Sequence, residues 1–309
     1  MAKYNDPKAA GLVGLGIMGG AFAQHLTVAG IRTLGYDVLQ PRMDELVASG
    51  GHSRTSPRAV ASEADLVITS LPSVKALEDA LFGSDGLIHA ARPELVVVET
   101  STLPLDPKES ARRRLAEAGV RMMDAPISGT GAQAKLKDIS ILASGDRADF
   151  DSARDMLSHF ARSVRYVGEF GAGSKVKYIA NLLVAIHTLA AAEALVMGQK
   201  AGLDLDLLLD VLKDGAGTSR MLEVRGPSMV ANTYPTPMIK VETFQKDLEI
   251  IAKFARDSGA PTPLFHTSIP LFTAAAAQGM NGYDTAAVVA VLREMAGLSA
   301  SNSQSARAK

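Results

Sequence analysis

The chain has 309 residues, of which 47% are hydrophobic and 21% are charged, and its 32 Lys and Arg nearly balance 33 Asp and Glu. This length and composition are typical of a globular protein large enough for two domains. The sequence has no stripe of basic residues, which argues against nucleic acid as a partner. The chain has no cysteine, which excludes disulfides, thiolate metal sites, iron–sulfur clusters and a catalytic thiol.

The N-terminal residues are polar and lead directly into a short apolar run, without the pattern of a secretory signal. The longest charge-free apolar stretch, residues 178–192, contains Asn181 and His187. It is also shorter than the roughly 20 residues that span a bilayer. We therefore expect a cytoplasmic protein with no membrane span.

Up to about residue 168, short β-rich runs alternate with segments rich in helix formers. The predicted strands cover residues 11–13, 32–36, 65–70, 94–100, 120–126, 139–144 and 162–168. Their near-continuous apolar character is typical of parallel strands covered on both faces. The alternation predicts an N-terminal α/β domain built on a doubly wound sheet.

Beyond residue 173 the pattern changes from strands to helices. Residues 174–197 contain no Gly or Pro and are rich in Ala and Leu, which predicts one long helix. Further helices are predicted over 204–213, 219–231, 240–258, 262–278 and 285–295. We expect two domains, 1–170 and 171–309, the second all-helical and joined to the first by the long helix, and a polar tail without chemistry.

A glycine-rich turn lies between the first predicted strand and the helix that follows it. It consists of Gly14, Leu15, Gly16, Ile17, Met18 and Gly19. The glycines permit a tight turn, close approach of a pyrophosphate and close helix packing, and the N–H groups at the helix start attract an anion. In this context the motif predicts a Rossmann-type dinucleotide site, although glycines of this spacing can also simply form a turn.

An acidic residue, Asp37, ends the second predicted strand, where a carboxylate can accept hydrogen bonds from the adenosine ribose. The same carboxylate repels a 2′-phosphate, so NAD is the predicted cofactor. NADP stays possible, since Arg42 lies five residues further on, where it can instead be an ordinary surface arginine.

Three further loops follow predicted strands, and the first two are expected to line the ligand crevice at the carboxyl ends of their strands. Two of them contribute Leu71, Pro72 and Thr102 to the predicted cofactor site, with Thr102 near the nicotinamide. The third contributes Ser128, Gly129 and Thr130, whose hydroxyl and N–H groups suit a small carboxylate.

Lys177 and Asn181 are four residues apart in the long predicted helix, so they share one face. A lysine in the first turn of a helix sits at the positive end of the helix dipole, which favours the neutral amine and hence proton exchange with an alcohol or carbonyl oxygen. The alternative is an exposed helix-end lysine like Lys175.

Several motifs taken together resemble the 3-hydroxyisobutyrate dehydrogenase, or β-hydroxyacid dehydrogenase, family. They are GLGIMG, STLP, DAPISGTGA, GAGSKVKYIAN and PMIKVETFQKDLEI, in order and over nearly the whole chain. The resemblance implies an NAD(P)-dependent enzyme that interconverts a short β-hydroxyacid and its semialdehyde or keto form. It implies that Lys177 is the catalytic acid/base, that Asn181 and residues 128–130 bind substrate, and that Lys246 lies beside the cofactor with Asp247 orienting the lysines.

The chain departs from the family pattern at Thr130, where a second glycine is commoner, at Ala180, where an asparagine is frequent, and at Glu99, where aspartate is usual. These departures bear on substrate identity. Residues 215–227 resemble the branch that acts on more hydroxylated acids, such as threonate or tartronate semialdehyde. Arg220 in this stretch either reaches the substrate or pairs with the residue three positions on.

Other chemistries find little support. No two histidines have metal-ligand spacing, so no metal site is predicted, and no GxSxG turn favours a hydrolase. Asp204 and Asp206 open a predicted helix and are expected to cap it. Two alternatives stay open, an imine reductase on the same scaffold and a non-catalytic nucleotide-binding module. Long apolar helices in the second half favour a homodimer or homotetramer.

Overall fold

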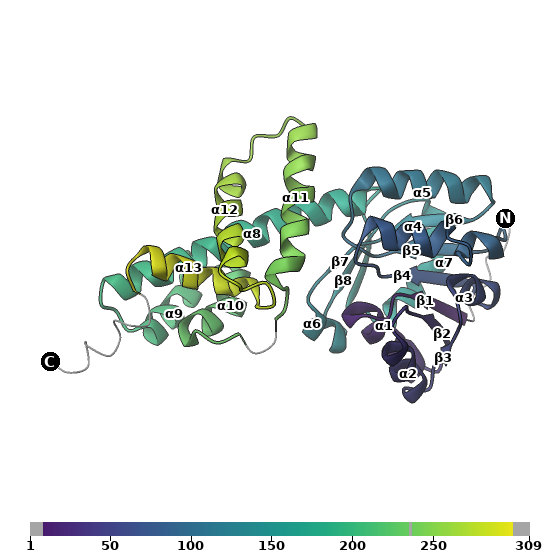
Figure 1. Ribbon diagram of the computed structural model, residues 1–309, viewed down its shortest axis with the longest axis horizontal. Helices are drawn as coiled ribbons and strands as arrows, with labels where there is room; N and C mark the ends of the chain where they lie inside the picture. Colours follow the sequence, from purple (N-terminus) through teal and green to yellow (C-terminus); the bar gives the residue numbers. More distant parts are fainter. Residues whose placement is uncertain (1–8, 235–236, 299–309) are drawn as a thin grey trace. The chain divides into compact units, whose positions relative to one another are not determined.

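The computed structural model describes residues 9–234 and 237–298, and the chain divides into two compact units, Met1–Lys177 and Tyr178–Lys309. The polar tail discussed above lies outside the described residues. The domain boundary expected after residue 170 stays a prediction. The fold class is confirmed, because the first unit is α/β and the second is helical (Figure 1).

The first unit is built on six parallel strands in the order β3-β2-β1-β4-β5-β6. The strands are β1 (Ala9–Val13), β2 (Arg32–Tyr36), β3 (His52–Ser53), β4 (Leu66–Thr69), β5 (Val96–Glu99) and β6 (Arg121–Asp124). Every residue of β1, β4 and β5 is buried, which accounts for their continuous apolar sequence. The strand order reverses between β1 and β4, where doubly wound sheets bind ligands.

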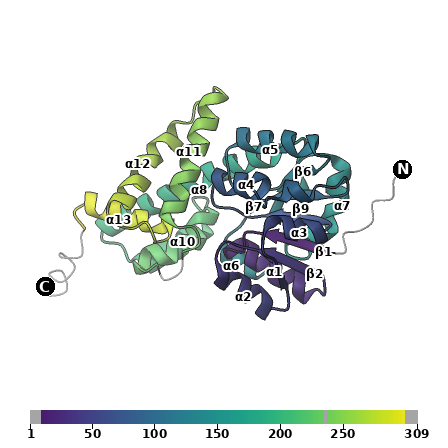
Figure 2. The same ribbon diagram turned by 45° about the vertical axis from the view of Figure 1, so that its right-hand side comes forward.

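Helices cover both faces of this sheet. They are α1 (Ile17–Val28), α2 (Gln40–Ala48), α3 (Pro57–Glu63), α4 (Val74–Phe82), α5 (Leu105–Glu117), α6 (Gly131–Lys135) and α7 (Arg147–Ser158), with a short 3₁₀ helix at Leu87–Ala90. Phe22 of α1 packs with residues of α6 and α7, whereas Leu77 of α4 and Leu115 of α5 belong to a separate core. Figure 2 accordingly has α1 and α6 on one side of the sheet and α4 and α5 on the other.

The expectation of one sheet through residue 168 is wrong. A second sheet of three strands holds β7 (Ile127–Ser128), β8 (Ser140–Ala143) and β9 (Ser163–Tyr166), with β7 antiparallel to β8. The chain between β7 and β8 is too short for the crossover that a parallel pair requires, so it turns back through α6. The two-residue strands β3 and β7 were not predicted, because runs so short carry no periodicity.

The second unit continues the long helix and adds five further helices and a 3₁₀ turn. They are α8 (Ala172–Lys200), α9 (Leu205–Asp214), α10 (Arg220–Ala231), α11 (Val241–Asp257), α12 (Pro263–Ala277) and α13 (Val288–Met295), the last preceded by a 3₁₀ turn at Thr285–Ala287. These bounds confirm the six helices expected from the sequence to within a few residues. As predicted, Asp204 caps α9 by accepting a hydrogen bond from the N–H of Leu207.

Helix α8 is long and apolar enough to cross a membrane by length and composition alone, which is weak evidence because core helices of soluble proteins pass the same test. Its residues from Tyr178 onward include several that pack in the core of the helical unit, such as Ala185 and Leu195. Thr188 is fully buried and hydrogen-bonds Arg225 of α10 at 3.0 Å. This half of α8 therefore serves as the centre of a helical core.

Candidate active site

The glycine-rich turn joins β1 to α1, as expected. Gly14 has a φ of +91°, and a Cβ there would lie 2.2 Å from the carbonyl oxygen of Ser70, so only glycine fits. A Cβ on Gly19 would lie 1.9 Å from the carbonyl oxygen of Gly14, which shows how closely α1 packs on the turn. Gly16 caps α1 without any side-chain hydrogen bond, so the first N–H groups of the helix keep their capacity for an anion.

The carboxylate of Asp37 is tied to this turn. One of its oxygens accepts a hydrogen bond from the N–H of Leu15 at 2.7 Å, and the other accepts from the N–H of Leu39 at 2.9 Å. The end of β2 thus holds the glycine-rich turn in shape, and the carboxylate lies beside it, where an adenosine ribose is predicted. Arg42 pairs with Glu45 on the surface of α2 at 2.9 Å.

Alanine at Gly16 should affect cofactor binding, whereas alanine at Gly19 should affect the stability of the fold. Nothing lies within 4 Å of a Cβ built on Gly16, so Gly16→Ala should leave the melting temperature unchanged and weaken NAD binding about ten-fold or more, by blocking the pyrophosphate. Gly19→Ala should lower the free energy of unfolding by about 1–3 kcal/mol because of the clash. Thermal unfolding and titration of NADH fluorescence measure both effects. NAD binding unchanged in Gly16→Ala would show that no dinucleotide approaches there.

The loops after β4 and β5 adjoin one another at the same edge of the sheet. The N–H of Leu71, which precedes Pro72, donates to the hydroxyl oxygen of Ser101 at 2.8 Å. The Thr100 hydroxyl donates to the carbonyl oxygen of Thr69 at 2.7 Å. The loop after β5 is therefore hydrogen-bonded to the chain at the end of β4 through Thr100 and Ser101, the two residues directly before Thr102.

Ser128, Gly129 and Thr130 have a more regular local structure than the loop that was expected. Ser128 belongs to β7, and Gly129 has a φ of +146°, so this stretch is a strand end with a fixed reversal. Thr130 caps α6, where its hydroxyl oxygen accepts from the N–H of Gln133 at 3.3 Å. A Cβ on Gly131 would lie 2.3 Å from the Ile17 side chain, which places this segment against the start of α1.

Lys177 lies in the second turn of α8, because the helix begins at Ala172 rather than at residue 174. The helix dipole therefore acts less on Lys177 than the sequence suggested, since the field of the dipole falls off within the first turn. Burial replaces it: Lys177 is only 8% exposed, whereas Lys175 is exposed. The alternative interpretation, in which Lys177 is an exposed lysine at the helix end, is therefore wrong.

In the helical unit, Asn181, Lys246 and Asp247 come together. The side-chain amide of Asn181 donates to Asp247 at 2.9 Å, and the ammonium of Lys246 donates to the other carboxylate oxygen of Asp247 at 2.8 Å. Asn181 and Asp247 are 3% and 6% exposed. The sequence named all three residues, but it did not connect Asn181 of α8 with Asp247 of α11, which are 66 positions apart.

Comparison with known proteins identifies the family. Residues 9–168 match the model of the NAD binding domain of 6-phosphogluconate dehydrogenase, and residues 171–292 match that of the NAD-binding region of NADP-dependent 3-hydroxyisobutyrate dehydrogenase. The chain belongs to the 3-hydroxyisobutyrate dehydrogenase family. It is an NAD(P)-dependent oxidoreductase of the hydroxyacid dehydrogenase type.

Individual relatives cover nearly the whole of this dehydrogenase. An L-threonate dehydrogenase from Cupriavidus necator is 37% identical over 91% of this chain and 95% of its own length. A 2-hydroxy-3-oxopropionate reductase from Escherichia coli is 32% identical over 93% and 97%. The crystal structure of a 3-hydroxyisobutyrate dehydrogenase from Salmonella typhimurium, 33% identical, superimposes with a TM-score of 0.82 over 92% of this chain and 99% of that one.

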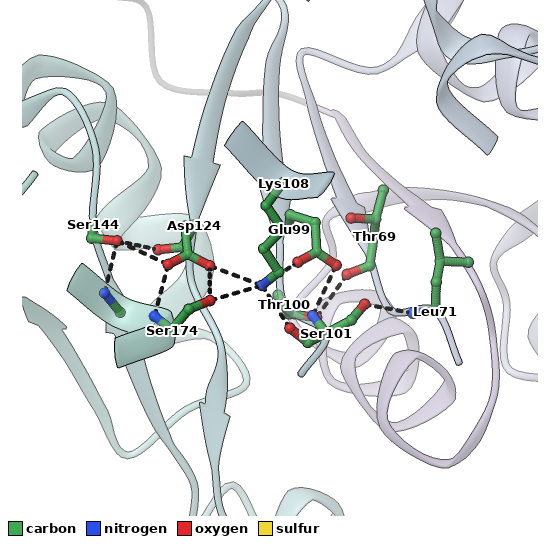
Figure 3. Close-up of polar contacts among 10 residues, drawn as sticks. Thr69, Leu71, Glu99, Thr100, Ser101, Lys108, Asp124, Ser144 and Ser174 are labelled. Atoms are coloured by element: carbon green, nitrogen blue, oxygen red, sulfur yellow. Dashed lines mark hydrogen bonds and ion pairs between the residues drawn. The ribbon is translucent and has the colours of Figure 1, made fainter. Parts of the chain in front are cut away.

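One cluster in the dehydrogenase was not predicted as a unit. The Lys108 ammonium of α5 lies 2.5 Å from a carboxylate oxygen of Glu99 and 2.8 Å from one of Asp124, and all three side chains are fully buried (Figure 3). Glu99 and Asp124 are paired neighbours at the ends of β5 and β6. The sequence feature that could have predicted the cluster is a carboxylate at the end of each of two apolar strands, with a lysine in the helix that connects them.

The charge state of Lys108 follows from its neighbours. Burial alone lowers the pKa of its ammonium, but the carboxylates of Asp124 and Glu99 outweigh burial, so the pKa is raised above that of an ordinary lysine. Lys108 therefore stays charged at working pH, which excludes it as a proton acceptor.

Two remaining expectations concern other side chains. Arg220 pairs with Glu223 at 2.9 Å on the surface of α10, in keeping with the helix-surface alternative, and its reach toward a substrate stays a prediction. Among residues 9–234 and 237–298, no cluster of three His, Asp or Glu side chains could hold a metal ion.

Proposed function

We propose that this dehydrogenase interconverts a short β-hydroxyacid and its semialdehyde or keto form, with Lys177 as the general acid/base. The observation that carries the proposal is the burial of Lys177, a charged residue type that is rarely buried without a role, one helical turn from the buried Asn181. A buried amine is more easily neutral than an exposed one, and neutral lysine can accept a proton.

The chemistry assigned to the chain's own residues is proton transfer and positioning. In the oxidation direction, neutral Lys177 takes the hydroxyl proton at its Nζ, while the Asn181 amide, held by Asp247, orients the substrate oxygen. In reduction, protonated Lys177 returns the proton to the carbonyl oxygen. When bound, the nicotinamide ring of the cofactor supplies the acceptor or donor of hydride.

The residues proposed for the cofactor are Gly14 to Gly19, Asp37, Leu71, Pro72, Thr102 and Lys246. An uncapped helix start beside three glycines fits a pyrophosphate, and the Asp37 carboxylate beside the turn favours NAD over NADP because it repels a 2′-phosphate. Arg42, the alternative partner for that phosphate, is already paired with Glu45.

The substrate proposed is a hydroxylated acid of the threonate, glycerate or 3-hydroxyisobutyrate type. Ser128, Gly129 and Thr130 would hold its carboxylate, and the Thr130 hydroxyl adds a polar group where the family pattern has glycine. Relatives named for L-threonate and for 2-hydroxy-3-oxopropionate support an acid with more than one oxygenated carbon. No nucleic acid or membrane is proposed as a partner.

A homo-oligomer, dimer or tetramer, is proposed for the working enzyme in the cytoplasm. Large apolar side chains are exposed on the helical unit, among them Ile179, Leu183 and Met197 of α8 and Leu207 and Val211 of α9. Such surface favours burial against another copy. Sedimentation velocity measures the assembly.

The experiment that tests the proposal follows absorbance of the reduced nicotinamide while the protein meets NAD or NADP and a panel of acids. The panel holds threonate, glycerate and 3-hydroxyisobutyrate, with the corresponding carbonyl acids and a cyclic imine in the reverse direction. Turnover of one hydroxyacid with NAD, at least about ten-fold faster in kcat/KM than with NADP, is the expected result.

The same panel decides between the alternatives. Turnover of the imine but of no acid would favour an imine reductase. Cofactor binding without turnover of any compound would favour a nucleotide-binding module. Imine reductases among the structural neighbours, such as that of Streptomyces aurantiacus at 22% identity and a TM-score of 0.62, share the fold alone.

A further inference from the structure

The buried Lys108 cluster extends from the sheet to the start of α8. Both the N–H and the hydroxyl of Ser174 donate to the Asp124 carboxylate at 2.7 Å, and the Lys108 ammonium lies 3.2 Å from the Ser174 hydroxyl oxygen (Figure 3). Beside them, the N–H of Gly173 donates to the hydroxyl oxygen of Ser144 at 2.9 Å. The first turn of α8 is therefore held by a carboxylate from β6, a negative charge at the positive end of the helix.

The same ammonium reaches the loop after β5. Lys108 donates to the carbonyl oxygen of Ser101 at 2.7 Å, and Glu99 accepts from the N–H of Ser101 at 2.9 Å. Thr102, proposed to lie near the nicotinamide, is the next residue. One buried nitrogen thus contacts both the loop that leads to Thr102 and the helix turn that leads to Lys177.

The helix start is also pressed against the second sheet. A Cβ on Gly173 would lie 2.2 Å from the carbonyl oxygen of Leu142 and 3.0 Å from that of Asp124. No side chain larger than hydrogen fits at this position, so the first turn of α8 lies directly against both backbones. Lys177 follows Ser174 by three residues, about 4.5 Å along the helix.

We infer that Lys108, Asp124 and Ser174 are positioning residues for proton transfer: they fix the first turn of α8, and with it Lys177, relative to the cofactor loop. The inference rests on the proposed role of Lys177. A cluster of one ammonium and two carboxylates is costly to bury, and apolar packing would often stabilise the fold as well. The cluster instead supplies a fixed geometry at the junction of loop and helix, where displacement by about 1 Å can cost a hundred-fold in rate.

The test uses Ser174→Ala in the full-length protein, which removes one hydroxyl and leaves the Ser174 N–H bond and all three charges in place. We expect kcat to fall about ten-fold or more, with KM for the acid and NADH affinity within about two-fold of the parent. Hydrogen exchange of a peptide covering 172–178 should accelerate at the same time. Ser144→Ala removes the acceptor of the Gly173 N–H. This variant should also lower kcat and accelerate exchange of the 172–178 peptide.

The matched control is Ser268→Ala in α12. Ser268 is fully buried, and its hydroxyl donates to the carbonyl oxygen of Phe265 at 2.7 Å, so the loss of one buried serine hydroxyl is comparable. In this variant, kcat and exchange over 172–178 should stay unchanged. An equal loss of kcat in Ser268→Ala would mean that Ser174 acts through general stability, and the inference would be wrong.

Failure of the inference and failure of the proposed function give different results. If Ser174→Ala keeps the parent kcat, or loses it without faster exchange over 172–178, the positioning role is overturned even where Lys177→Ala is inactive. If Lys177→Ala is active while exchange responds to Ser174→Ala as expected, the proposed acid/base is wrong and the cluster holds the helix for another purpose, which also overturns the inference.

Discussion

Lys177→Ala is expected to lower kcat by about 10²–10⁴-fold, the usual contribution of a positioned acid/base. The reason is that the alcohol proton then has no amine to receive it, while the cofactor site is untouched. Steady-state kinetics with the best acid of the panel measure the loss, and NADH titration should give an affinity within about two-fold of the parent.

Two matched variants sharpen this prediction. Lys175→Ala removes an exposed lysine two residues earlier on the same helix and should keep the parent kcat. Lys177→Arg keeps a positive charge but cannot lose a proton at working pH, so it should be about as slow as Lys177→Ala. Activity in Lys177→Arg would mean that charge alone, rather than proton transfer, is what position 177 supplies.

The pH profile gives an independent measurement. Oxidation requires neutral Lys177, so kcat of the parent should rise with pH, and kcat for reduction should fall over the same range. The residual activity of Lys177→Ala should lack this rise. If kcat for oxidation does not change with pH in the parent, and Lys177→Ala gives the same flat profile, Lys177 is not the acid/base.

Lys108→Met is expected to lower the free energy of unfolding by about 3–5 kcal/mol, because it leaves the buried carboxylates of Glu99 and Asp124 without their cation. Chemical denaturation measures the change. Lys75→Met is the matched control: Lys75 pairs with Asp79 at 2.5 Å on the surface, with side chains 83% and 63% exposed, and its loss should cost no more than about 1 kcal/mol.

The pH dependence of the Lys108 effect follows from its raised pKa. A lysine whose folded pKa exceeds its unfolded value contributes its full stabilisation below the unfolded value, and this is lost only as pH rises through the folded one. The parent should therefore keep this contribution from about pH 5 to pH 9.

Neutral partners provide the decisive comparison for Lys108. Adding Glu99→Gln and Asp124→Asn to Lys108→Met removes the unbalanced charge and should recover more than about 1 kcal/mol. If this triple variant is no more stable than Lys108→Met, the lost packing of the lysine chain, and not the charge, accounts for the deficit.

The sequence by itself determined the class of fold and the class of reaction. Continuous apolar runs predicted buried parallel strands, and the Gly-free stretch from residue 174 predicted α8, because both are local patterns that each segment imposes on its own backbone. The glycine-rich turn and Asp37 were found for the same reason, since their order along one βαβ unit fixes their place. Even Arg220 followed its three-residue spacing to Glu223.

Only the tertiary structure decided what depends on distant partners. The second sheet arises because β7 meets β8 from the other direction, and the burial of Lys177 beside an exposed Lys175 depends on what packs on α8. The contact between Asn181 and Asp247 and the ion cluster of Lys108 join residues that are far apart in the chain. Burial and pairing are properties of the packed chain, so no local pattern in the sequence carries them.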